Sequence, residues 1–124
     1  PIILELGDAF RSWCNPQGED NKDASFSVPF FRAAVTGYAR EAWDFLAEEE
    51  WQALPAATLT ITVELAARFA ADALVERHFG WDSKRYGTAS EHNQVRAESQ
   101  VSLAQSIRAQ WSVMEDIVAA RIGS

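Results

Sequence analysis

The stretch from residue 56 to 79 constrains the fold most, because it is apolar on nearly every side and holds no internal glycine or proline. Its first part, Thr58–Leu65, alternates threonine with larger side chains, which is typical of a β-strand. Its second part places Phe69 and Ala73 at helical spacing. We expect one helix over 56–79, lying centrally in the core. A strand over Thr58–Leu65 followed by a helix is the alternative interpretation.

A second helix is predicted before this stretch. Ser27 has the side chain of a helix N-cap, and Pro29 suits the first helical turn. Apolar residues then recur at helical spacing from Phe31 to Phe45. The acidic run Glu48–Glu50 that follows looks like a solvated end, but negative charge is unfavourable at a helix C-terminus. We therefore expect the helix either to stop earlier or to continue through Trp51 and Leu54.

The third helix is predicted after a tight connection. The pair Thr88-x-x-Glu91 is a capping box, which marks a helix N-terminus. From Glu91 to Gln100 the sequence is mostly polar, so these turns are expected to face solvent, a partner or a polar site. An apolar stripe at helical spacing follows, with Trp111 at its centre in the core: Leu103, Ile107, Trp111, Met114, Val118 and Ile122.

The N-terminal region is less defined by its pattern. Residues 2–14 fit either a strand or a short helix, and the loop Asn15–Ser25 is rich in charge and in helix breakers. We therefore predict an all-α fold, a small bundle of three long helices plus a short N-terminal element. One domain would cover 1–124, with a helical core from residue 26. The alternative fold class is α+β, with strands near 2–6 and 58–65.

Composition narrows the classes of function. The 124 residues carry a net charge of −7, which disfavours binding to nucleic acid or to anionic lipid and favours a basic protein partner. Apolar runs are interrupted by charged residues before they reach membrane-spanning length. The first residues are too short for a signal peptide, and Cys14 is the single cysteine. We expect a soluble cytoplasmic protein and a structural Cys14.

The two histidines do not form a metal motif. His78 follows Glu76 by two positions and His92 follows Glu91 directly, so neither pair lies on one helix face. The sequence also lacks a nucleotide-binding loop and a nucleophile with its base. We therefore expect no metal and no cofactor.

Arg85 and His92, seven positions apart at a helix start, are a catalytic candidate. A small helical domain with this arrangement is similar to the HEPN ribonuclease superfamily. That resemblance implies cleavage of an RNA phosphodiester, with Arg85 holding the phosphate and His92 acting as acid or base. Tyr86 departs from the family pattern, where a small polar residue usually follows the arginine.

Taken together, these patterns favour a non-enzymatic protein–protein interaction module, such as an adaptor, an assembly subunit or an inhibitor of a basic partner. Self-association is compatible with this interpretation. The HEPN-like ribonuclease is the alternative. The predicted partner-binding residues are the acidic and aromatic side chains outside the apolar stripes, with one glutamine: Glu48, Glu49, Glu50, Trp51, Trp81, Glu91, Gln94 and Glu98.

Overall fold

The computed structural model describes residues 2–42, 44–75 and 80–121. Within these ranges the chain is all-α, which confirms the predicted fold class, and it contains no strand. Both strand alternatives, near 2–6 and over 58–65, are therefore wrong. The helices are α1 (Ile2–Trp13), α2 (Val28–Ala42), α3 (Glu48–Gln52), α4 (Leu54–Val75), α5 (Ala89–Ala109) and α6 (Trp111–Ala120).

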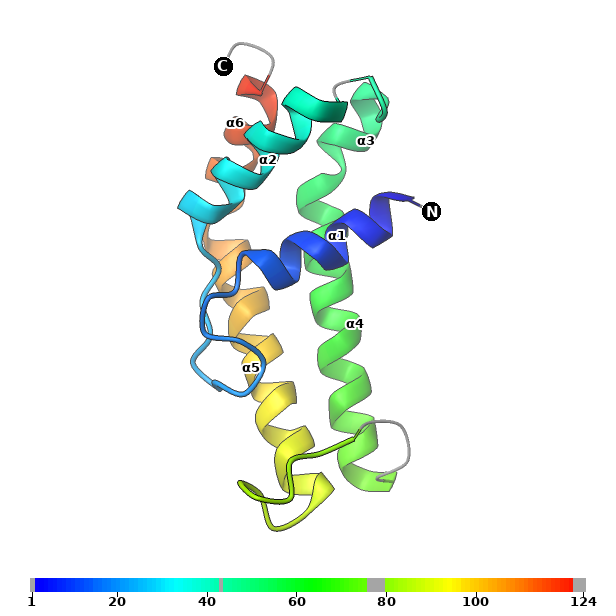
Figure 1. Ribbon diagram of the computed structural model, residues 1–124, viewed down its shortest axis with the longest axis vertical. Helices are drawn as coiled ribbons and strands as arrows, with labels where there is room; N and C mark the ends of the chain where they lie inside the picture. Colours follow the sequence, from blue (N-terminus) through cyan, green and yellow to red (C-terminus); the bar gives the residue numbers. More distant parts are fainter. Residues whose placement is uncertain (1, 43, 76–79, 122–124) are drawn as a thin grey trace.

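Helices α4 and α5 are the two longest and run antiparallel, side by side along the long axis of the molecule (Figure 1). The threonines of α4 are compatible with a helix because their hydroxyls bond within it. Thr58 Oγ1 donates to the carbonyl of Leu54 at 2.8 Å, and Thr62 Oγ1 donates to the carbonyl of Thr58 at 2.7 Å. Burial of these hydroxyls thus leaves no unmet hydrogen bond, and the alternating pattern does not produce a strand.

Helix α1 crosses α4 at a steep angle (Figure 1). The crossing is close, because a Cβ added at Gly7 would lie 2.7 Å from the carbonyl carbon of Ala57. Leu6 and Phe10 beside it are buried. The N-terminal element is therefore part of the core.

The main core takes buried side chains from α1 to α6. Phe31 is fully buried, and its ring centroid lies 5.6 Å from that of Phe10 and 5.5 Å from that of Phe26. Ser27 begins α2 as predicted, since its Oγ accepts from the Phe30 amide at 3.2 Å. Thr88 begins α5 in the same way, accepting from the Glu91 amide at 3.1 Å.

Two details of the predicted helices differ in the structure. Helix α2 ends at Ala42, the earlier of its two expected ends, and the acidic run Glu48–Glu50 forms the first turn of α3. A helix N-terminus favours negative charge, and Glu50 also accepts a hydrogen bond from the Ala47 amide at 3.0 Å. The predicted last helix is divided at Gln110 into α5 and α6. Trp111, next to that break, is only partly buried, whereas Met114 is fully buried.

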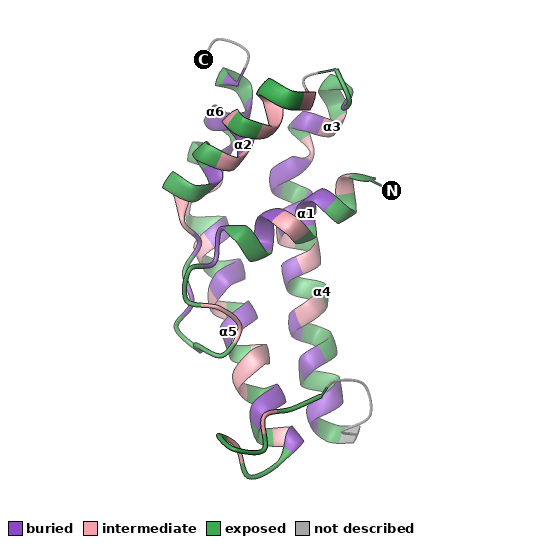
Figure 2. Ribbon diagram, in the orientation of Figure 1, coloured by how far each residue is buried: buried purple, intermediate pink, exposed green. Residues whose placement is uncertain are grey.

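Helix α4 is not buried all round, contrary to expectation. One side packs on α1 and α5, while the opposite side is open to solvent (Figure 2). Leu74 on that open side is 87% exposed and Val63 is 52% exposed. We call these uncharged, exposed positions the outer stripe: Ala56, Thr60, Val63, Ala67, Ala70, Ala71 and Leu74. By length and composition α4 could cross a membrane, a test that core helices of soluble proteins also pass.

The glycine at the α1–α4 crossing gives the first testable prediction. Gly7→Ala should lower the free energy of unfolding by about 1–3 kcal/mol, because the new methyl group meets the α4 backbone. The matched control is Gly37→Ala in α2, where an added Cβ meets nothing within 4 Å. That change should stabilise the protein by up to about 1 kcal/mol. Urea denaturation measures both, and equal effects of the two substitutions would contradict the close crossing.

Candidate functional site

The polar first half of α5 binds the loop that joins α1 to α2. His92 bonds Asp20 at 2.7 Å, and Ser99 Oγ donates to the Gly18 carbonyl at 3.2 Å. Further along the helix, Ser106 Oγ accepts from the Phe26 amide at 2.8 Å. Polar side chains along α5 therefore fasten residues 18–26 to the α4–α5 pair.

Asp20 brings together the two residues of the catalytic candidate. Its Oδ1 lies 2.7 Å from His92 Nε2, and its Oδ2 accepts from Arg85 Nη1 at 3.2 Å. The Asp82 amide donates to His92 Nδ1 at 3.0 Å. Because Nδ1 is an acceptor, the neutral ring carries its proton on Nε2 and donates it to Asp20.

The surroundings of His92 fix its ring. The ring is 3% exposed, and Tyr86 stacks on it with 4.2 Å between centroids and 10° between planes. Arg85 in turn lies 5.4 Å from the centre of the Tyr86 ring. Both nitrogens of His92 are engaged and Arg85 is paired with a carboxylate, so this cluster holds the connection between α4 and α5 against the loop.

The predicted partner-binding residues do not form one surface. Those of α3 lie at one end of the molecule, and those of residues 81–98 lie toward the other (Figure 1). Trp51 is buried, with Tyr38 at 5.8 Å and Arg121 at 4.7 Å from its ring, so it is not an exposed aromatic.

The acidic and polar members of this set have internal partners of their own. Hydrogen bonds from Arg121 and Gln52 hold the pKa of Glu48 below its usual value. Glu91 accepts from the Gly87 amide at 2.9 Å, and Gln94 donates to Ser90 at 3.2 Å. Glu49 and Glu98 are exposed, and Trp81 is 40% exposed.

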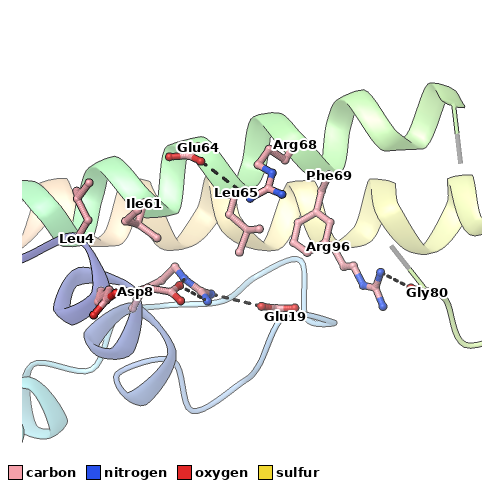
Figure 3. Close-up of a pocket in the computed structure, with 12 residues that line it drawn as sticks. Leu4, Asp8, Glu19, Ile61, Glu64, Leu65, Arg68, Phe69, Gly80 and Arg96 are labelled. Atoms are coloured by element: carbon pink, nitrogen blue, oxygen red, sulfur yellow. Dashed lines mark hydrogen bonds and ion pairs between the residues drawn. The ribbon is translucent and has the colours of Figure 1, made fainter. Parts of the chain in front are cut away.

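The close approach of α1 to α4 leaves a groove of about 570 Å³ beside the crossing (Figure 3). Four apolar side chains form the floor of the groove, one from α1 and three from α4: Leu4, Ile61, Leu65 and Phe69. Leu4 is 37% exposed, so part of this floor is open to solvent. The groove thus offers apolar surface within a recess.

Charged side chains line the rim of the groove. Arg11 pairs with Asp8 at 2.8 Å and with Glu19 at 3.4 Å, while Arg68 lies 4.0 Å from Glu64. Glu5 adds a further carboxylate. Arg96 completes the set, and its Nη1 donates to the Gly80 carbonyl at 2.7 Å (Figure 3).

Sequence patterns did not identify this groove, because its two walls come from helices about fifty residues apart. The i, i+4 spacing of Glu64 and Arg68 did place both on one flank of α4. The pattern could not indicate that α1 crosses there. No family model matches the sequence, so the site is interpreted from its geometry alone.

The remaining candidates concern metal binding and the cysteine. His78 and Glu76 lie outside the described residues, and among the described ones no three potential metal ligands form a group. Cys14 is fully buried, and this burial raises the pKa of its thiol to about 12. The thiol therefore stays protonated at neutral pH and is a poor nucleophile.

The buried thiol predicts a pH effect on stability. In the unfolded chain Cys14 ionises near the ordinary thiol pKa of 9.0, whereas in the folded protein it ionises only near 12. The unfolded state therefore loses its proton first, and the contribution of Cys14 to stability falls as pH rises from about 9 to 12. Cys14→Ser should flatten this part of the stability curve. A thiol reagent at neutral pH should label the wild type only after unfolding, and rapid labelling of the native protein would contradict the burial.

Proposed function

We propose that this chain is a non-enzymatic protein–protein interaction module of the cytoplasm. Its binding site is the α1–α4 groove, and its ligand is a basic amphipathic segment of a partner protein. The observation that carries this proposal is the combination of an open apolar floor with a carboxylate-bearing rim in one recess. Apolar side chains of the partner would cover Leu4 and Leu65, and its lysines or arginines would meet the rim.

The charges on the rim favour a positively charged partner segment. The rim holds four carboxylates against three arginines, so its net charge is negative: Glu5, Asp8, Glu19 and Glu64 against Arg11, Arg68 and Arg96. The side chains of Asp8 and Glu64 are 57% and 58% exposed. The chain as a whole carries −7. A positively charged segment would be steered toward such a surface, and a negatively charged segment would be repelled.

The proposal can be tested with a synthetic amphipathic peptide of leucine and lysine. A second peptide, with glutamate in place of each lysine and the same leucines, serves as the ligand control. We expect the lysine peptide to bind and the glutamate peptide not to bind. The double variant Glu5→Lys, Glu64→Lys should weaken binding about tenfold or more in a calorimetric titration.

A charge-matched protein variant provides the decisive control. Glu49→Lys with Glu98→Lys changes the net charge equally at exposed positions outside the groove. It should weaken binding much less than the groove variant. A greater loss in this control would overturn the groove assignment and return the site to the acidic residues predicted from sequence.

The HEPN-like ribonuclease remains the alternative, since Arg85 and His92 do meet at Asp20. Three contacts disfavour it. Both His92 nitrogens are engaged, the ring is buried under Tyr86, and Asp20 offsets the charge that Arg85 would offer a phosphate. A structural role for the cluster is the simpler interpretation.

The two roles of His92 predict different results for His92→Ala. Under the structural role, the variant leaves the Asp82 amide without its acceptor and lowers the free energy of unfolding by about 1–3 kcal/mol. RNA incubated with either protein stays intact. Cleavage of single-stranded RNA by the wild type and not by a folded His92→Ala protein would instead establish the ribonuclease.

A further inference from the structure

The outer stripe of α4 is a second uncovered surface, on the side of the helix away from α5. It extends over 56–74, about 27 Å at the rise of an α-helix, and the exposed charged residues of this segment, Glu64 and Arg68, lie along one flank of it. The chain as a whole is acidic, with a net charge of −7. Its large apolar side chains on the stripe, Val63 and Leu74, are 52% and 87% exposed, and a helix packed along the stripe would bury them.

The order of residues along the stripe identifies the partner. Five of its seven positions are symmetric about Ala67, with Thr60 and Leu74 seven positions away on either side and Val63 and Ala71 four positions away. An antiparallel copy of the same helix, related by a twofold axis at Ala67, places each residue opposite its mirror position. We propose that two copies of this chain pair through α4 in this antiparallel arrangement.

The sizes of the facing side chains support this register. Leu74, the largest residue of the stripe, would face the smaller Thr60 of the second copy. Val63 would face Ala71, and Ala67 would face its own counterpart at the axis. Large residues opposite small ones and a small residue at the centre allow two helices to approach closely.

The charges beside the stripe also fit a twofold axis. Glu64 and Arg68 lie on the same flank of the stripe and already approach one another within one helix at 4.0 Å. In the antiparallel pair, Glu64 is displaced by two residues, about 3 Å along the axis, from Arg68 of the second copy. Glu64 of each copy would therefore lie beside Arg68 of the other, which is the reciprocal arrangement of an isologous contact.

The size and charge of the chain set the strength of this pairing. A stripe about 27 Å long and about 10 Å wide is smaller than the roughly 800 Å² per partner of stable complexes, so the dimer should be weak and reversible. Two copies of net charge −7 repel each other, and added salt should strengthen the pairing. Salt should weaken the peptide binding proposed for the groove, so the two surfaces respond in opposite directions.

Cysteine cross-linking under mild oxidation tests the register on the full chain. Ala67→Cys should form a disulfide-linked dimer, since the two cysteines meet at the axis. Leu74→Cys alone and Thr60→Cys alone should not, because each lies about 21 Å from its own mate. The double variant Thr60→Cys, Leu74→Cys should cross-link again. The wild type should stay unlinked because its thiol at position 14 is buried.

Sedimentation of the unmodified protein over a wide concentration range completes the test. Concentration-dependent dimers that are lost in Val63→Glu, while the helical circular dichroism is kept, would support the pairing. A monomer at every concentration, or cross-linking of Leu74→Cys alone, would overturn it. Glu64 and Arg68 border both surfaces, but the substituted positions Thr60, Val63, Ala67 and Leu74 do not line the groove. These results therefore test the pairing separately from peptide binding.

Discussion

The close crossing of α1 over α4 is the contact on which the rest of the structure depends. Gly7 lets the two backbones approach so closely that no side chain fits between them. That approach buries Leu6 and Phe10 on one side of α1, where Phe10 meets the aromatic core. On the other side it forms the groove, because two cylinders that cross steeply leave a recess beside their contact.

A second constraint is the polar surface of α5. A helix with His92, Asn93, Ser99 and Gln100 buried would be unstable if those groups had no partners. The loop after α1 supplies several of them through its backbone carbonyls and Asp20. Asn93 instead donates to the buried Asp72 of α4 at 2.9 Å. One side of the polar half of α5 is therefore interior, and of the three expected surroundings (solvent, a partner or a polar site) this side has a polar contact within the same chain.

This difference explains how far the sequence could predict the molecule. The caps at Ser27 and Thr88 are local, since each involves residues at most three positions apart, and both were predicted correctly. The strand alternative over 58–65 was wrong because the threonine hydroxyls bond one turn back along the helix, which alternation alone does not reveal. The cluster at Asp20 joins residues 72 positions apart, so only the folded arrangement could bring them together.

The exposure of α4 shows why an apolar pattern does not fix burial. The expectation that 56–79 lies centrally assumed enough helices to cover every side. In the described chain α1 and α5 cover the side that includes Phe69 and the threonine hydroxyls, while α2, α3 and α6 gather at one end (Figure 1). The outer stripe remains, and contacts within the described part of the chain leave Val63 and Leu74 exposed. Helix α4 thus borders two different surfaces. The groove has charged side chains on its rim and suits a charged ligand, whereas the stripe is uncharged and suits an apolar helix.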